Sequence, residues 1–108
     1  MPAVPRVITE AEWHAEGERR FGPRQRYWAF QCPLCRGVQT GEDFSALGCS
    51  PSAASDAVDT ACIGGYVEGR GCEATVHGLH PVHRLVVVFP DGHHEPRFEF
   101  APAARRTP

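Results

Sequence analysis

The chain has 108 residues, 42% of them hydrophobic, and a formal net charge of -2. This length predicts a single domain with a modest core. Its 11 basic residues, all arginine, face 13 acids, which excludes a protein that coats nucleic acid through a general basic excess. No apolar run approaches the roughly 18 residues of a membrane span, and the amino-terminal residues lack the apolar region of a signal peptide. We therefore expect a protein of the reducing cytoplasm with no membrane partner.

The first predicted element is a helix that begins after Thr9. Thr9 is a favourable N-cap, and Glu12 stands at the third helical position, where it completes a capping box. We expect the helix to run to about Arg20. Gly22 and Pro23 then end it, because glycine accepts a left-handed conformation and proline cannot continue the helix.

Alternation over residues 26–32 predicts a strand next. Trp28, Phe30 and Cys32 fall on one face of this strand, and residues of the opposite face are more polar. The strand therefore delivers the thiol of Cys32 to its end.

Two weaker helical signals follow. Thr40 and Asp43 form a second capping box, which predicts a short helix over residues 41–47, and Gly48 is a plausible stop. Residues 50–57 are small and polar, and indicate either a loop or a single helical turn.

A β-hairpin is predicted near the end of the chain. Residues 83–89 are rich in β-branched side chains, residues 96–100 alternate, and an Asp-Gly turn signal lies between them. We expect Phe98 and Phe100 to face the core. From Ala101 onward the sequence is typical of a frayed tail.

Five cysteines carry the chemistry of this chain, and an odd number cannot form a complete set of disulfides. The C-x-x-C spacing of Cys32 and Cys35 lets two thiolates reach one ion, and Cys62 with Cys72 can close a tetrahedral shell. Four thiolates around zinc, at about 2.3 Å each, leave no position for water or substrate. Cys49 is then the spare thiol, expected to behave as a small buried hydrophobic residue.

Other metal sites stay open at this point. Cys49 could replace one of the later thiols, or a histidine could complete the shell. A second, open site for a metal-dependent hydrolase would draw on the same histidines and an acid. The residues concerned are His77, His80, His83, Glu73 and Asp91.

The C-x-x-C turn also occurs in thiol redox proteins, where a long helix begins at the turn and lowers the pKa of the first thiol. Here glycines and β-branched residues follow Cys35 directly, so no long helix can begin there. This disfavours redox chemistry.

The order of these elements and cysteines resembles one group of proteins over most of residues 9–100. The matching residues are Arg19-Arg20-Phe21-Gly22-Pro23, Cys32-Pro33-Leu34-Cys35, Val38-Gln39-Thr40, Asp43-Phe44, Cys62-Ile63-Gly64, Gly71-Cys72 and Gly78-Leu79. They resemble small uncharacterised zinc-ribbon-like proteins found mainly in bacteriophages and prophages. The resemblance implies the same four cysteine ligands for one zinc ion, and carries no established activity. Gly65 departs from it, because the group is expected to favour Arg there, which weakens any anion-binding role for this loop.

These features together predict an α+β fold. We expect a small zinc-ribbon-like domain over residues 9–100, with an N-terminal helix, a C-terminal β-hairpin and one tetrahedral site of four cysteines. Residues 1–8 and 101–108 are predicted to be tails.

The expected function is that of a non-enzymatic, phage-type zinc-binding module that binds a macromolecule. A host or phage protein is the first expectation for the partner, in the host cytoplasm if a phage encodes the chain, and no small-molecule substrate is expected. Nucleic acid is the alternative, because arginines interleave with aromatic rings in one segment. Its residues are Arg19, Arg20, Arg24, Arg26 and Tyr27. A plainer interpretation is that the neighbouring rings belong to the core and the arginines are solvated.

Overall fold

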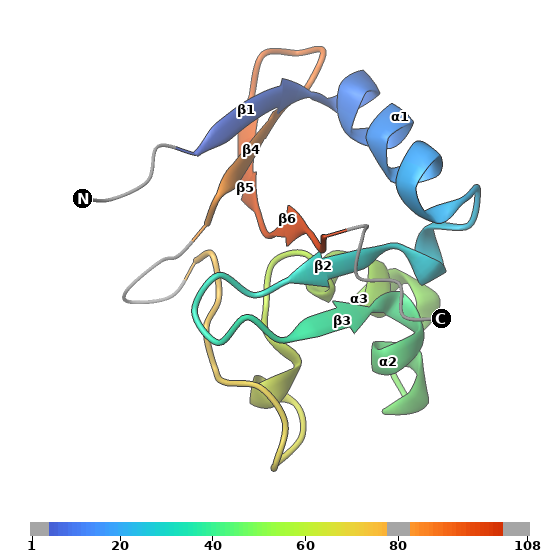
Figure 1. Cartoon of the computed structure of the whole chain (residues 1–108), viewed down its shortest axis with the longest axis vertical. Helices are drawn as coiled ribbons and strands as arrows, with labels where there is room; N and C mark the ends of the chain where they lie inside the picture. Colours follow the sequence, from blue (N-terminus) through green and yellow to red (C-terminus); the bar gives the residue numbers. More distant parts are fainter. Residues whose placement is uncertain (1–4, 78–82, 103–108) are drawn as a thin grey trace.

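The structure, a computed structural model, describes residues 5–77 and 83–102, and folds them into two three-stranded sheets and three α-helices (Figure 1). The first sheet has the strand order β1-β4-β5 and the second β3-β2-β6. The strands are β1 (Arg6–Thr9), β2 (Ala29–Gln31), β3 (Val38–Thr40), β4 (Leu85–Val88), β5 (His94–Arg97) and β6 (Glu99–Phe100). The helices are α1 (Glu10–Phe21), α2 (Gly41–Ala46) and α3 (Pro51–Ala57), with short 3-10 helices η1 (Gln25–Tyr27) and η2 (Ile63–Gly65). The predicted α+β class is confirmed.

The domain begins earlier than the sequence predicts. β1 pairs in parallel with β4, with Val7 opposite Val86, although the expected tail covers residues 1–8. The partner of this short strand lies far along the chain, and no local signal can point to it. Residues 1–4 lie outside the described residues.

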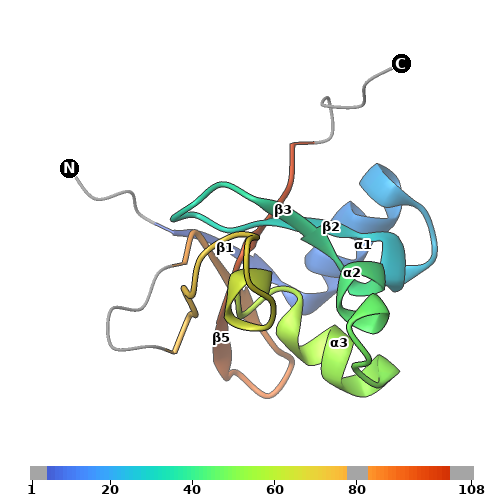
Figure 2. The ribbon, with the colours of Figure 1, turned by 90° about the horizontal axis from the view of Figure 1, so that it is seen from below.

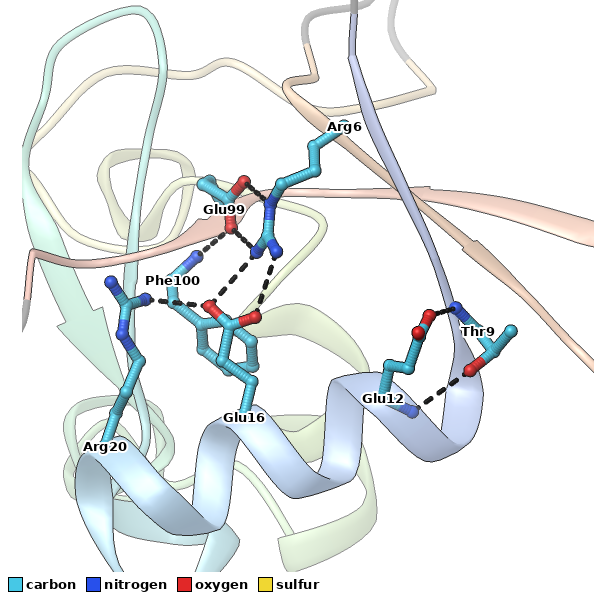
Figure 3. A network of polar contacts seen from close by, with 7 residues as sticks. All are labelled: Arg6, Thr9, Glu12, Glu16, Arg20, Glu99 and Phe100. Carbon is cyan, nitrogen blue, oxygen red and sulfur yellow. Dashed lines mark hydrogen bonds and ion pairs between the residues drawn. The ribbon is translucent and has the colours of Figure 1, made fainter.

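An ionic network holds β1 to the helix that follows it (Figure 3). The Arg6 guanidinium donates to both carboxylate oxygens of Glu99, at 2.7 and 2.8 Å, and to those of Glu16 on α1, at 2.9 and 3.1 Å. Arg20 also pairs with Glu16. Helix α1 starts at the predicted capping box of Thr9 and Glu12, which the figure also shows, and ends before Gly22, whose φ is 94°.

The C-terminal hairpin forms, but its second strand is divided. β4 pairs with β5, which begins at His94 and not at the predicted Pro96. The Phe98 amide donates to the Asp59 carbonyl, at 2.6 Å, and so leaves the first sheet. β6 then pairs with β2, which places Phe100 opposite Phe30. Phe98 and Phe100 are both buried, as expected.

The C-terminal boundary also differs from the prediction. Ala101 is buried and its amide donates to the Ala29 carbonyl, so the frayed tail does not begin there. Residues 103–108 lie outside the described residues.

The strand predicted over residues 26–32 is shorter than expected. Its first part forms η1, and only Ala29–Gln31 pair as β2. Trp28, Phe30 and Cys32 are buried, as the alternation predicts. Gly17 on α1 lies against the Trp28 ring so closely that a Cβ atom there would overlap it. The glycine therefore lets α1 pack directly on this indole.

Helices α2 and α3 lie side by side next to the end of β3 (Figure 2). α2 starts at the predicted Thr40–Asp43 capping box, and Gly48, with φ of 96°, follows it. α3 exceeds the single turn considered for this segment, because Ser50 caps it and Pro51 fits its first turn. Within the described residues, no helix is both long and apolar enough to cross a membrane.

Candidate metal centre

A tight turn between β2 and β3 holds the first two thiols. Cys32 follows β2 directly, and its carbonyl accepts from the Arg36 amide at 2.8 Å. The Gly37 carbonyl accepts from the Cys32 amide at 3.0 Å and closes the turn. Arg36 has a φ of 66°, a left-handed conformation that few non-glycine residues adopt. This geometry turns the Cys35 thiol back toward that of Cys32.

The other two thiols come from a loop that folds back on itself. Cys62 precedes η2, and Cys72 ends the loop that follows this 3-10 helix. The Cys72 amide donates to Sγ of Cys62 at 3.3 Å, and the Ala74 amide donates to Sγ of Cys72 at 3.4 Å. In the first turn the Gly37 amide donates likewise to Sγ of Cys35. Backbone amides thus donate to three of the four sulfurs.

All four Sγ atoms lie within 4.8 Å of one another. The Cys32–Cys72 and Cys35–Cys62 sulfur pairs are 3.6 and 3.8 Å apart. A disulfide would need about 2.05 Å. A tetrahedron of sulfurs at about 2.3 Å from a central zinc has edges of about 3.8 Å, so these separations fit four ligands of one ion.

The thiols differ in burial and in their readiness to ionise. Cys32 and Cys62 are buried, Cys72 is half-buried and Cys35 is exposed. Burial raises the pKa of Cys72 to about 12, although the Ala74 amide lowers it, and burial also raises the pKa of Cys35. At Cys62 burial opposes ionisation, but the donating amides outweigh it and the pKa is lowered. The four thiols together could hold one cation, which would favour their thiolate forms.

Glycines make the close approach of the two loop segments possible. A Cβ atom on Gly64 would overlap the backbone of Cys72, and one on Gly71 would lie 2.7 Å from Sγ of Cys62. Gly71 also has a φ of 67°. At Gly65, by contrast, a Cβ atom would meet nothing within 4 Å, so the site does not require glycine there.

Sequence reasoning missed the residue that joins the two halves of the site. Gln39 on β3 is buried, and its Nε2 atom donates to the carbonyls of Val58 and Ala61, at 2.8 Å each. Its Oε1 atom accepts from the Ile63 amide at 2.9 Å. The side chain thereby fixes the segment that carries Cys62 to the hairpin that carries the C-x-x-C turn. From hydrophobicity alone, the valine of this strand would be expected to face the core, and the glutamine to face solvent.

A family model of VVA0879-like proteins matches residues 9–101, which includes all four clustered cysteines. The chain belongs to the VVA0879-like family. No curated protein and no solved structure matches it.

The VVA0879-like chain leaves the other predicted ligands outside the cluster. Cys49 lies outside the cluster and packs against the core, but it is half-buried and not fully buried as expected. His77 is exposed, His83 is half-buried, and His80 lies outside the described residues. In residues 5–77 and 83–102, the four cysteines are the only group of three or more histidine, cysteine, aspartate or glutamate side chains placed to hold an ion. The open second site considered for a hydrolase does not form within these ranges.

The arginine-rich segment of the VVA0879-like protein is partly neutralised. Arg20 pairs with Glu16 at 3.2 Å, and Arg26 pairs with Glu42 at 3.4 Å. Arg26 also lies over the ring of Tyr27, which is exposed. Arg19 and Arg24 are exposed as well. The segment thus presents a smaller positive charge than its composition suggests.

Proposed function

We propose that this protein binds one structural zinc ion through Cys32, Cys35, Cys62 and Cys72, and acts without catalysis by binding a macromolecular partner. The observation that carries the proposal is the sulfur cluster, whose spacing suits one tetrahedral ion. Four thiolates fill the coordination shell, so the ion has no open position at which to activate water or polarise a substrate.

The identity of the ion has a direct test. We expect elemental analysis of protein purified without added metal to give one zinc per chain, and cobalt substitution to give the absorption of tetrahedral thiolate coordination. Iron in place of zinc, or an ion that binds after all four cysteines have been alkylated, would contradict the proposal.

A redox role has less support than a structural one. The chain continues from the C-x-x-C turn into β3, so no helix N-terminus lies at the turn to stabilise a reactive thiolate.

We infer that the partner is a protein, of the host or of a phage if the chain has the phage origin that its sequence suggests. Three large apolar side chains are exposed within four residues of a ligand cysteine: Leu34 (64%), Val38 (45%) and Tyr66 (52%). Such side chains favour an apolar interface. Nucleic acid is less favoured, because two of the five residues predicted to contact it, Arg20 and Arg26, pair with carboxylates.

Affinity capture with a matched variant tests the class of partner. We expect a tagged chain to retain a host or phage protein after nuclease treatment, and a Leu34→Asp/Tyr66→Asp variant with normal zinc content to lose it. Leu47→Asp is the control, because Leu47 is an exposed apolar side chain at the end of α2 and is more than ten residues along the chain from each of the four clustered cysteines. Capture that disappears with nuclease and falls steeply with salt would assign nucleic acid instead.

A further inference from the structure

The C-x-x-C turn contains a backbone conformation that its sequence does not favour. Arg36 has a φ of 66° and is the only non-glycine residue with a positive φ in the part of the chain that the structure describes. Side chains are disfavoured in this left-handed region because the Cβ atom crowds the following carbonyl, and glycine carries no such penalty. The formation of the turn therefore does not account for an arginine at this position.

The backbone of Arg36 is engaged inside the hairpin, whereas its side chain is free. The Arg36 amide donates to the Cys32 carbonyl at 2.8 Å, and the Arg36 carbonyl accepts from Nε2 of Gln31 at 3.2 Å. The residue is exposed, and its guanidinium takes part in none of the ion pairs among the described residues. Arg70, by contrast, pairs with Asp43 at 3.3 Å. The guanidinium of Arg36 is thus available to a partner.

An apolar side chain accompanies this cation on the same turn, which lies at the outer end of the β2-β3 hairpin (Figure 2). Leu34 is 64% exposed, the largest fraction among the large hydrophobic residues that the structure describes. Leu34 and Arg36 stand on either side of Cys35 in the sequence. An ion bound at the four thiols would fix the backbone that carries both side chains, so that less conformational freedom is lost when a partner binds.

The charge of this region favours a protein carboxylate over a nucleic acid. From Cys32 to Cys72 the sequence has two arginines and five acids, a formal net charge of -3. Four thiolates around a divalent ion add further negative charge. A nucleic acid needs several cations to neutralise its phosphates, whereas one carboxylate can pair with a single guanidinium.

We propose that Leu34 and Arg36 form a contact site for an acidic segment of the partner protein, in which a glutamate or aspartate lies next to an aliphatic side chain. The inference rests on the proposed function, and it adds the chemistry by which the partner is recognised. The carboxylate accepts hydrogen bonds from the Arg36 guanidinium, and the aliphatic side chain covers Leu34.

A short peptide tests this chemistry. The probe is a capped pentapeptide of alternating leucine and glutamate, and the control peptide has glutamine in place of glutamate. In an NMR titration of the zinc-loaded protein, we expect the acidic peptide to shift the side-chain Nε signal of Arg36 and the methyl signals of Leu34, and the glutamine peptide to shift them much less. Equal shifts with both peptides, or no shift with either, would overturn the proposal. Larger shifts with a thymidine oligonucleotide would overturn it in favour of nucleic acid.

Arg36→Gly separates recognition from stability. This variant should melt at or above the temperature of the wild type and keep its zinc, because glycine relieves the left-handed conformation. It should also bind the acidic peptide about threefold or more weakly. Arg24→Gln is the control, because it removes the charge of an exposed arginine outside the turn and should leave peptide binding unchanged. A lower melting temperature or a loss of zinc in Arg36→Gly would show that the guanidinium serves the fold or the thiolates, and would overturn the proposal.

Affinity capture distinguishes this inference from the proposed function. If Arg36→Gly retains the captured protein that Leu34→Asp/Tyr66→Asp loses, the inference fails and the proposed function stands. A wild-type chain that retains no protein would contradict the proposed function, and the inference with it.

Discussion

Gly64 lies where the two backbone segments of the loop approach most closely. A Cβ atom there would overlap the amide and carbonyl of Cys72, neither of which can move without moving a ligand. Side-chain chemistry is thus only part of the requirement for the metal centre. The backbone must also bring Cys62 and Cys72 within reach of one ion.

Gly64→Ala should therefore displace Cys72 and weaken metal binding. We expect the melting temperature to fall by about 10 °C or more, because overlap with a rigid backbone costs about 3 kcal/mol or more. Calorimetry and metal content measure both effects. Gly65→Ala is the matched control and should melt at or above the temperature of the wild type, since its Cβ atom meets open space. Equal behaviour of the two variants would contradict the close approach at Gly64.

The cysteines themselves make a second prediction. Cys32→Ser should lose the ion and unfold or become insoluble, because the free energy of metal binding in such sites is free energy of folding. Cys49→Ser should keep its metal content, since Cys49 packs against the core outside the cluster. Elemental analysis of both proteins checks the assignment, and metal lost from Cys49→Ser would show that the wrong four thiols had been chosen.

Among the structural elements, the β2-β3 hairpin depends on one polar side chain for its connection to the second half of the site. Gln39 makes three hydrogen bonds in the interior, to Val58, Ala61 and Ile63. These groups belong to the segment that runs from the end of α3 to the first residue of η2 and includes Cys62.

Gln39→Leu should remove all three bonds and leave two carbonyls and one amide buried without partners. Each such group costs about 1–3 kcal/mol, so we expect a loss of at least about 3 kcal/mol in the free energy of unfolding. Gln31→Leu on the neighbouring strand should cost much less, because Gln31 makes an exposed bond to the Arg36 carbonyl. Urea denaturation of the zinc-loaded proteins compares them, and similar losses would argue against a special role for Gln39.

Elements with local signals could be predicted, and those that depend on distant partners could not. Thr9 and Thr40 start their helices as predicted, since a cap and its partner lie three residues apart. The spacing of the four cysteines likewise predicted the cluster. By contrast, β1 needs β4, and Phe98 leaves the hairpin to reach the Asp59 carbonyl. Sequence patterns report on residues that are close along the chain. These long-range pairings and the buried hydrogen bonds of Gln39 therefore left no recognisable signal.

At the scale of the whole molecule, stability depends on the charge state of a buried acid. Asp59 has a pKa of about 6 in the folded chain against an ordinary value of 3.8, because burial disfavours its charge. The folded state therefore binds the proton more tightly than the unfolded state does. This contribution to stability is complete below about pH 4 and is lost as the pH rises through about 6.

Comparison with Asp59→Asn isolates this effect. Between pH 5 and 7.5 the wild type should lose about 1.4 kcal/mol of unfolding free energy relative to the variant. Both proteins share the pH dependence of metal binding and of other acids, so those effects cancel in the difference. Denaturant unfolding at several pH values measures it, and parallel pH profiles would show that Asp59 does not titrate in this range.

The pairing of Arg6 with Leu85 in the first sheet determines when this protein can fold during synthesis. β1 leaves the ribosome before the rest of this domain, and its hydrogen-bonding partner is translated 79 residues later. The segment from Cys32 to Cys72 emerges between them, so we expect a nascent chain to acquire its ion before either sheet is complete. With the proposed ion bound at that stage, cellular proteases and chaperones would first encounter an intermediate in which β1 and α1 are still undocked.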